Sequence, residues 1–304
     1  MAFMSSFRQR HHLNFPHKIL LAVAFLATTT VHAGDLPLWE LEGTEGRVLL
    51  MGSVHFLRST DYPLPPEVDA AYAAADTLIM EIDMDDLDPM TAQAVLASIG
   101  TNENGTSLKD ALGESDYAKA AQLAEGLGIP LGLFEAFKPW FAALSITQLR
   151  MIQLGFDPAW GIETRMTANA QAEGKTVLGL ETLEEQLSFM DQLDAETQRL
   201  FLLQSLEDAT EVQEEVQAIV SAWRSGDTNA LEQLLIEGLQ ETPRLFDSLL
   251  TQRNQNWVPQ IMDIAEQPGN HLVIVGAMHL VGDNSVLSML EDRGISSRQL
   301  STED

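Results

Sequence analysis

Two histidines each stand three residues after a glycine, directly behind a short apolar run. In RVLLMGSVH the pair is Gly52 and His55, and in HLVIVGAMH it is Gly276 and His279. Glycine has no Cβ atom, so it lets the chain turn sharply and brings the backbone close to a ligand. Neutral imidazole is a common ligand of zinc, manganese, iron and cobalt. One such motif is usually a turn beside a packed histidine, but these two copies use two of the three histidines outside the first 33 residues. We therefore interpret His55 and His279 as metal ligands, with Gly52 and Gly276 close to the bound cofactor.

Carboxylates end two other apolar runs in the same way. Glu81 stands near the end of TLIMEID, and Glu181 ends TVLGLE. In open α/β sheets, ligands bind at the carboxyl ends of the strands. If these strands are mostly parallel neighbours, Glu81 and Glu181 meet His55 and His279 in one crevice. Either carboxylate could then be a metal ligand and the other a general base.

A further polar cluster lies in TQRNQNWVPQI, which places Arg253, Asn254 and Trp257 on a predicted helix. Arg253 and Trp257 are four positions apart and share a helix face. Arg253 could pair with a site carboxylate or form an ordinary salt bridge, and the spacing alone does not decide between them. Glu163, in GIETR, is interpreted only as part of a helix start, and His271 is expected at the surface.

The elements that must position these residues follow from the apolar pattern. Near-continuous apolar runs favour strands that helices cover on both faces. Such runs occupy residues 47–51, 77–80, 129–134, 176–180 and 272–275. Helices are expected at 65–76 and at 114–128, which ends near glycines. Residues 183–267 are rich in Leu, Gln and Glu at helical spacing and are predicted to be a helical insertion or lid, with Asp227 or Thr228 as an N-cap. The predicted fold class is α/β, with a mostly parallel or mixed sheet flanked by helices.

The N-terminus has the pattern of a secretory signal. Residues 1–18 carry three basic and no acidic side chains, apolar residues 19–27 follow, and small residues precede a cleavage position after Ala33. This apolar segment falls well short of the roughly 20 residues that cross a bilayer. We therefore expect a cleaved signal rather than a membrane anchor. Residues 34–304 are expected to form a single soluble domain that is periplasmic or secreted.

The exported chain is strongly acidic. Without its signal it keeps 14 basic and 45 acidic residues, a formal net charge of −31. Such a charge repels nucleic acid and anionic lipid surfaces, so neither is an expected partner. The sequence contains no cysteine, which excludes a disulfide framework. Its hydrophobic content of 45% is typical of a folded chain.

The motifs together resemble the TraB/GumN family, which includes the Tiki proteases of animals. The resemblance covers nearly all of residues 38–300. It is carried by GSVHFL, TLIMEID, FKPW, GFDPAWGIE, GKTVLGLETLEEQL, AWRSGD, RNQNW and VGAMHLVG. It implies a core similar to erythromycin-esterase and haem-binding ChaN-like proteins. His55 and His279 match the paired histidines of the family and Glu81 its glutamate. Arg253 and Asn254 match a polar pair that recurs in it. The Tiki proteins are membrane-tethered, and in this the chain departs from them.

Two functions of different classes follow from these observations. The first is an exported metal-dependent hydrolase that acts on a peptide or protein substrate. In it, His55 and His279 would hold a manganese, cobalt or zinc ion, with Glu81 or Glu181 as a further ligand. The second is a non-catalytic protein that binds a peptide signal or haem in the same crevice. The TraB branch is associated with the silencing of peptide pheromones, which binding alone could achieve.

Overall fold

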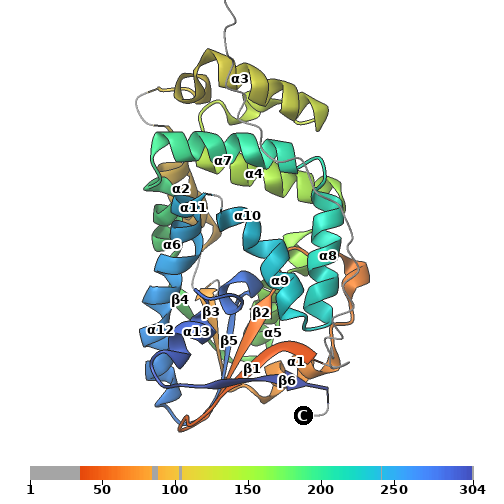
Figure 1. The fold of residues 1–304 in the computed structure, drawn as a ribbon, viewed down its shortest axis with the longest axis vertical. Coiled ribbons are helices and arrows are strands. Elements are labelled where there is room, and N and C mark those ends of the chain that lie inside the picture. The colour runs from red at the N-terminus through yellow and green to blue at the C-terminus, as the bar shows by residue number, and fades with distance from the viewer. Residues whose placement is uncertain (1–34, 84–87, 103–104, 241, 303–304) are drawn as a thin grey trace, which may run out of the picture. The chain divides into compact units, whose positions relative to one another are not determined.

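The computed structural model describes residues 35–83, 88–102, 105–240 and 242–302, all within one compact unit (Figure 1). The predicted signal, residues 1–33, lies outside the described residues. Among the residues described, no helix is both long enough and apolar enough to cross a membrane.

The centre of the unit is a mixed sheet of six strands in the order β4-β3-β5-β2-β1-β6. The strands are β1 (Asp35–Leu41), β2 (Arg47–Ser53), β3 (Thr77–Ile82), β4 (Thr176–Glu181), β5 (Asn270–Gly276) and β6 (Ser297–Ser301). Strands β4, β3, β5 and β2 are parallel neighbours, and β1 is antiparallel to both β2 and β6. The predicted fold class is confirmed.

The register of the parallel strands brings their carboxyl ends level. Ser53 of β2 lies beside Gly276 of β5, and Ile82 of β3 lies beside Glu181 of β4. The four strands whose ends carry polar side chains therefore finish at the same edge of the sheet.

Helices cover both faces of the sheet. Leu272 and Ile274 of β5 belong to one core, which α1, α5 and α8 complete. Val273 and Val275 belong to the opposite core, which α12 and α13 complete. This alternation is the two-residue period of a strand that is buried on both sides.

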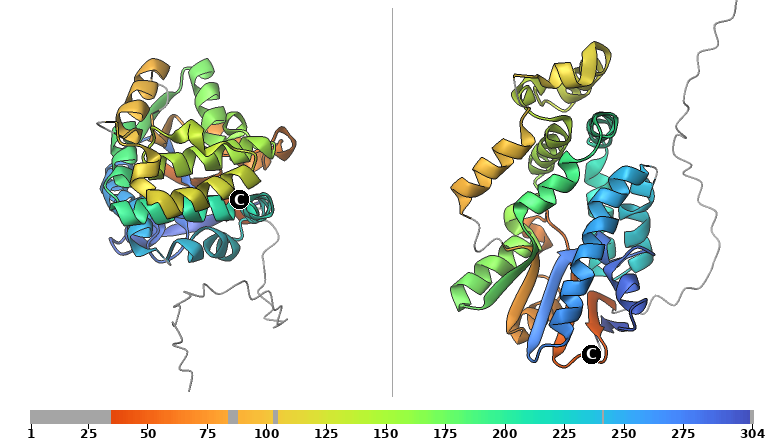
Figure 2. Two further views of the ribbon diagram at one scale, coloured as in Figure 1. Left: turned by 90° about the horizontal axis from the view of Figure 1, so that it is seen from above. Right: turned by 90° about the vertical axis from the view of Figure 1, so that its left-hand side faces the viewer.

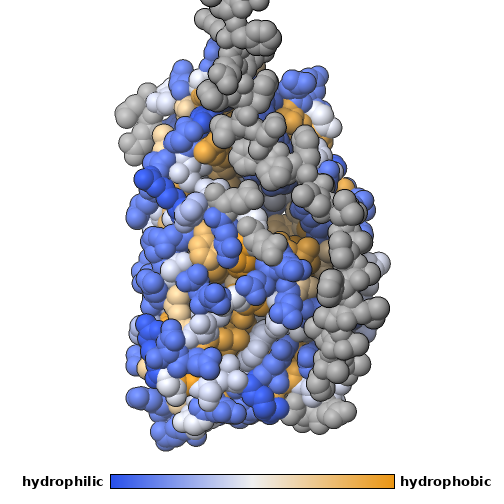
Figure 3. Space-filling model, in the orientation of Figure 1, coloured by the Kyte–Doolittle hydropathy of each residue, from blue (hydrophilic) through white to orange (hydrophobic). Residues whose placement is uncertain are grey.

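A helical layer with its own cores lies beyond the carboxyl ends of the strands, as both views of the ribbon show (Figure 1, Figure 2). The helices in chain order are α1 (Pro66–Ala74), α2 (Pro89–Gly100), α3 (Leu108–Gly126), α4 (Pro139–Gln153), α5 (Ile162–Glu173), α6 (Leu183–Asp191), α7 (Ala195–Asp208), α8 (Val212–Arg224), α9 (Thr228–Leu235), α10 (Glu237–Gln240), α11 (Pro243–Phe246), α12 (Gln252–Ala265) and α13 (Val286–Glu291). Residues 183–267 are thus largely helical, and Asp227 caps α9 by accepting from the Ala230 amide. Their action as a lid stays a prediction. On the face shown in Figure 3, hydrophilic residues predominate and hydrophobic ones gather in the middle.

Several predicted elements differ from the structure. Residues 129–134, predicted as a strand, contain the 3-10 helix η2 (Leu131–Phe134). The helix predicted at 114–128 corresponds to the part of α3 that follows its kink at Gly113, and it ends at Gly126. His271, predicted at the surface, is only 8% exposed because β5 lies between two other strands of the sheet.

Candidate active site

Three side chains that the sequence singles out as site residues meet at the backbone of Gly276. A Cβ atom placed on this glycine would lie 3.2 Å from His55 Nε2, 3.3 Å from Glu81 Oε1 and 3.6 Å from His279 Cδ2. The structure thus brings the two motif histidines and the glutamate near the carboxyl end of β3 to one point. We call these three side chains the Gly276 cluster.

The two Gly-x-x-His turns are built against each other. Gly276 begins the 3-10 turn η5 (Ala277–Leu280), which carries His279 back over the sheet. A Cβ atom on Gly52 would lie 3.1 Å from Ala277 Cα, so the absence of a side chain lets the turns pack closely. The Gly52 carbonyl accepts a hydrogen bond from Trp223 Nε1 at 2.6 Å. Gly52 therefore lets the second turn pack closely against it, and its carbonyl binds Trp223 of α8.

His55 is backed by a carboxylate that comes from α5. Its Nδ1 lies 2.7 Å from Glu163 Oε1, and the Ser53 hydroxyl donates to the same oxygen. The Glu163 charge raises the pKa of His55 to about 9. Burial of Glu163 acts to raise its own pKa, but His55 and Ser53 outweigh it, and the pKa is lowered. The His55 side chain is 57% exposed, so solvent can reach the ring while Glu163 fixes its orientation.

His279 is buried and its protonation state follows from its partners. The Asn254 amide group donates to the Asn284 carbonyl at 2.7 Å, which leaves Asn254 Oδ1, 2.6 Å from His279 Nδ1, as an acceptor. The Nδ1 atom therefore carries the proton, and Nε2 presents a lone pair to Arg253 Nη1 at 3.2 Å. Burial, with the nearby Arg253 charge, lowers the pKa of His279 to about 3. His279 is thus a neutral imidazole.

Arg253 joins the two carboxylates at the ends of β3 and β4. Its Nη2 lies 2.5 Å from Glu81 Oε2 and 2.6 Å from Glu181 Oε1, and its Nε donates to Glu181 at 3.0 Å. All three side chains are buried, with residue exposures of 6% for Arg253, 8% for Glu81 and 9% for Glu181. Of the two alternatives that the sequence left open for Arg253, pairing with a site carboxylate is the one observed, and Arg253 pairs with both carboxylates.

The two carboxylates differ in their remaining partners. Burial acts to raise the pKa of Glu81, but Arg253, the histidines and the Gly276 amide, which donates at 2.7 Å, lower it to about 2. Burial prevails at Glu181 and raises its pKa, although Arg253 opposes it and Trp257 Nε1 donates at 3.1 Å. Glu81 is consequently the more acidic carboxylate of the pair.

The sequence was compared with known families and proteins. Residues 37–299 match the TraB/PrgY/gumN family. The chain belongs to this family. It is 26% identical over 241 residues to the uncharacterized protein YbaP of Escherichia coli (strain K12), a match that covers 79% of this chain and 86% of YbaP. YbaP of Shigella flexneri matches to the same extent. No solved structure matches the chain.

The family assignment confirms the resemblance. The resemblance implies a bound metal ion, so the question is whether the residues present fit one. Each histidine of this TraB/PrgY/gumN chain has its Nδ1 engaged and its Nε2 directed toward the cluster, and Glu81 is ionised. This donor set fits a divalent ion. In the arrangement observed, however, Arg253 Nη1 contacts His279 Nε2, which lies 3.9 Å from Glu81 Oε1. Across the described ranges, no group of three or more His, Asp or Glu is placed to hold a metal. Arg253 compensates the negative charge of the buried carboxylates in this arrangement.

Three residues of this TraB/PrgY/gumN site were not identified from the sequence. Glu163 and Ser53 hold His55, and Gln186 donates to both buried carboxylates, at 3.2 Å to Glu81 and 3.0 Å to Glu181. Glu163 stands in the first turn of α5, as its sequence context predicts, but nothing local to GIETR indicates its partner. Ser53 lies inside the first Gly-x-x-His motif, and its position there was the available signal.

Proposed function

We propose that this protein is a metal-dependent hydrolase that cleaves peptide bonds at the Gly276 cluster. The observation that carries the proposal is the convergence of His55 Nε2, Glu81 Oε1 and His279 on one point, within 3.6 Å of a Cβ atom built on Gly276. The peptide substrate rests on the resemblance to the Tiki branch of the family. The predicted signal at residues 1–33 supports action in the periplasm or outside the cell.

Each side chain has a role in this proposal. His55 and His279 would hold a manganese, cobalt or zinc ion through Nε2, and Glu81 through its carboxylate. When bound, such an ion lowers the pKa of water and polarises a carbonyl oxygen. Glu163 and Asn254 keep the Nδ1 atoms occupied, so that both Nε2 atoms are presented to the cluster.

In this proposal, Glu181 is the residue that transfers the proton. Burial raises its pKa, which favours the uptake of a proton by this carboxylate. Gln186 donates to both Glu181 and Glu81 and so fixes the two carboxyl groups relative to each other. Arg253 keeps the charge of Glu81 stable in a buried place.

The test is a substitution that fills the cluster without changing any charge. Gly276 has φ −52° and ψ 137°, which alanine adopts freely, yet the new Cβ atom would lie 3.2 Å from His55 Nε2 and 3.3 Å from Glu81 Oε1. We expect Gly276→Ala to fold but to lose bound metal and peptide cleavage. Gly126→Ala is the matched control, because a Cβ atom there meets nothing within 4 Å.

The measurements are metal content by mass spectrometry and cleavage of a peptide library, each with and without a chelator. We expect about one divalent ion per chain in the wild type, and cleavage that stops on chelation. Wild-type metal content and cleavage in Gly276→Ala would refute the proposal. Metal binding without cleavage would instead support the second candidate, a binding protein for a peptide signal or haem.

A further inference from the structure

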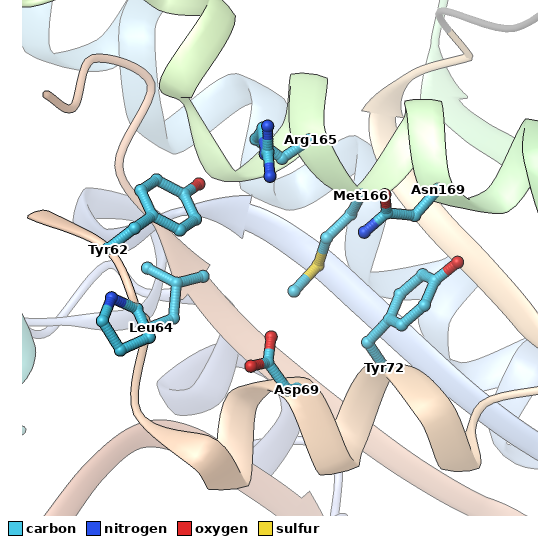
Figure 4. A pocket seen from close by; sticks show the side chains of 8 residues that line it. Tyr62, Leu64, Asp69, Tyr72, Arg165, Met166 and Asn169 are labelled. Atoms are coloured by element: carbon cyan, nitrogen blue, oxygen red, sulfur yellow. The ribbon is translucent and has the colours of Figure 1, made fainter. Parts of the chain in front are cut away.

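A cavity of about 170 Å³ lies on the sheet face that α1 and α5 cover, and its lining includes no member of the Gly276 cluster. Figure 4 shows the side chains that line it, from the segment before α1, from α1 and from α5. They are Tyr62, Pro63, Leu64, Asp69, Tyr72, Arg165, Met166 and Asn169. The volume is below the roughly 300–1,000 Å³ of pockets for drug-sized ligands, so a ligand of this cavity must be small.

Arg165 is held at the cavity by aromatic rings and not by a carboxylate. Its guanidinium lies 5.2 Å from the ring centre of Tyr62 and 5.0 Å from that of Trp160. The two rings are 5.6 Å apart, and the Tyr62 hydroxyl donates to the Trp160 carbonyl at 2.8 Å. Among the described residues, no carboxylate oxygen lies within the 4.0 Å of an ion pair with Arg165. A stacked guanidinium keeps its N–H donors available for an anion.

The carboxylate of Asp69 faces the Arg165 guanidinium across an apolar part of the cavity lining. Asp69 of α1 and Arg165 of α5 point toward each other from opposite sides of the cavity (Figure 4) without forming an ion pair. Leu64 and Met166 lie between them, Tyr72 lies beside Met166, and all three are buried. A site with both charges and an apolar floor is complementary to a ligand that carries both charges and an apolar group.

We propose that this cavity binds a free α-amino acid with an apolar side chain. The carboxylate of the amino acid pairs with Arg165, its ammonium group pairs with Asp69, and its side chain lies over Leu64 and Met166. A ligand with a carboxylate alone meets the Asp69 charge unpaired, and an amine alone meets the Arg165 charge unpaired. The site does not depend on the hydrolase activity, since none of its residues belongs to the Gly276 cluster.

The test is calorimetric titration of the protein with L-leucine, with chemical-shift changes in NMR spectra as a second measurement. Isovalerate and isoamylamine are the matched probes, because each keeps the leucine side chain and one of its two charged groups. We expect leucine to bind and each single-charge probe to bind at least about tenfold more weakly.

The variants are Arg165→Met and Asp69→Asn, both at exposed positions whose replacement leaves the core intact. Each should weaken leucine binding at least about tenfold. Arg293→Met, which removes an exposed arginine just after α13, should bind leucine as the wild type does. Three results would overturn the proposal: no leucine binding up to about 10 mM in either measurement, unchanged binding in Arg165→Met, or isovalerate binding as tightly as leucine.

Discussion

The buried arginine of the site gives the most direct test of its electrostatics. Arg253→Met keeps an unbranched side chain of similar width but removes the cation that Glu81 and Glu181 share. Both carboxylates are less than 10% exposed, so water cannot replace the lost partner. Breaking a buried ion pair in this way costs about 3–5 kcal/mol, because an uncompensated charge stays inside. That is a large fraction of the roughly 5–15 kcal/mol by which native proteins are stable, and it should lower the melting temperature by about 10 °C.

The loss in Arg253→Met should depend on pH with a definite sign. Without the cation, burial raises the folded-state pKa of Glu81 and Glu181 above the unfolded value. A group with a raised folded pKa contributes stability below its unfolded pKa, and that contribution is lost as pH rises. In the wild type, Glu81 has its pKa lowered to about 2 from 4.5, so its contribution is present above pH 4.5. The difference between wild type and variant therefore grows as pH rises from 4.5 toward 7.

The assay is urea unfolding followed by circular dichroism at pH 5 and pH 7. The double variant Arg253→Met with Glu181→Gln should recover part of the loss, because it removes one of the two uncompensated carboxylates. Arg293→Met is the matched control at an exposed position and should change stability by less than about 0.5 kcal/mol. A loss in Arg253→Met below about 1 kcal/mol, or a loss independent of pH, would refute the assignment of Arg253 as the compensating charge.

Three further predictions concern the histidines and the signal. Glu163→Gln should lower the pKa of His55 from about 9 toward 6.5, since the charge that raises it is gone, and an NMR titration of the imidazole signals checks this. An unchanged value would contradict the pairing. Asn254→Ala leaves the buried Nδ1–H of His279 without its acceptor and should cost about 1–3 kcal/mol in urea unfolding, whereas a cost within about 0.5 kcal/mol would contradict the inferred proton position. Intact-mass measurement of protein from an exporting host should show a chain that begins at Gly34, and retention of the preceding residues in exported protein would exclude cleavage.

The sequence predicts those site residues that stand at or just after the ends of strands. A strand buried on both faces is a short continuous apolar run, and the first polar residue after it marks the strand end. Glu81 and Glu181 stand at such positions, and His55 and His279 follow shortly after the ends of β2 and β5. Parallel pairing then brings them to one edge, because the register of β2 with β5 and of β3 with β4 leaves the strand ends level.

The part that the sequence did not predict depends on contacts between distant segments. The Ser53–Glu163 hydrogen bond joins residues 110 positions apart, and GIETR has the same local pattern whether or not its glutamate has a partner. Residues 129–134 are apolar enough for a strand, and so short a run does not distinguish a strand from another buried segment. β1 and β6 were missed because charged and polar side chains interrupt their apolar pattern.

The two histidines show why the Gly-x-x-His motif does not by itself set the chemistry of its imidazole. Both rings have Nδ1 occupied, but Glu163 backs His55 with a charge, whereas Asn254 backs His279 with a neutral amide. The first partner raises the pKa to about 9, and in the second case burial lowers it to about 3. A carboxylate in place of Asn254 would favour a second imidazolium, and two like charges would then face each other beside Gly276. The amide avoids that repulsion, so one protonated imidazolium and one neutral imidazole can share a single small site.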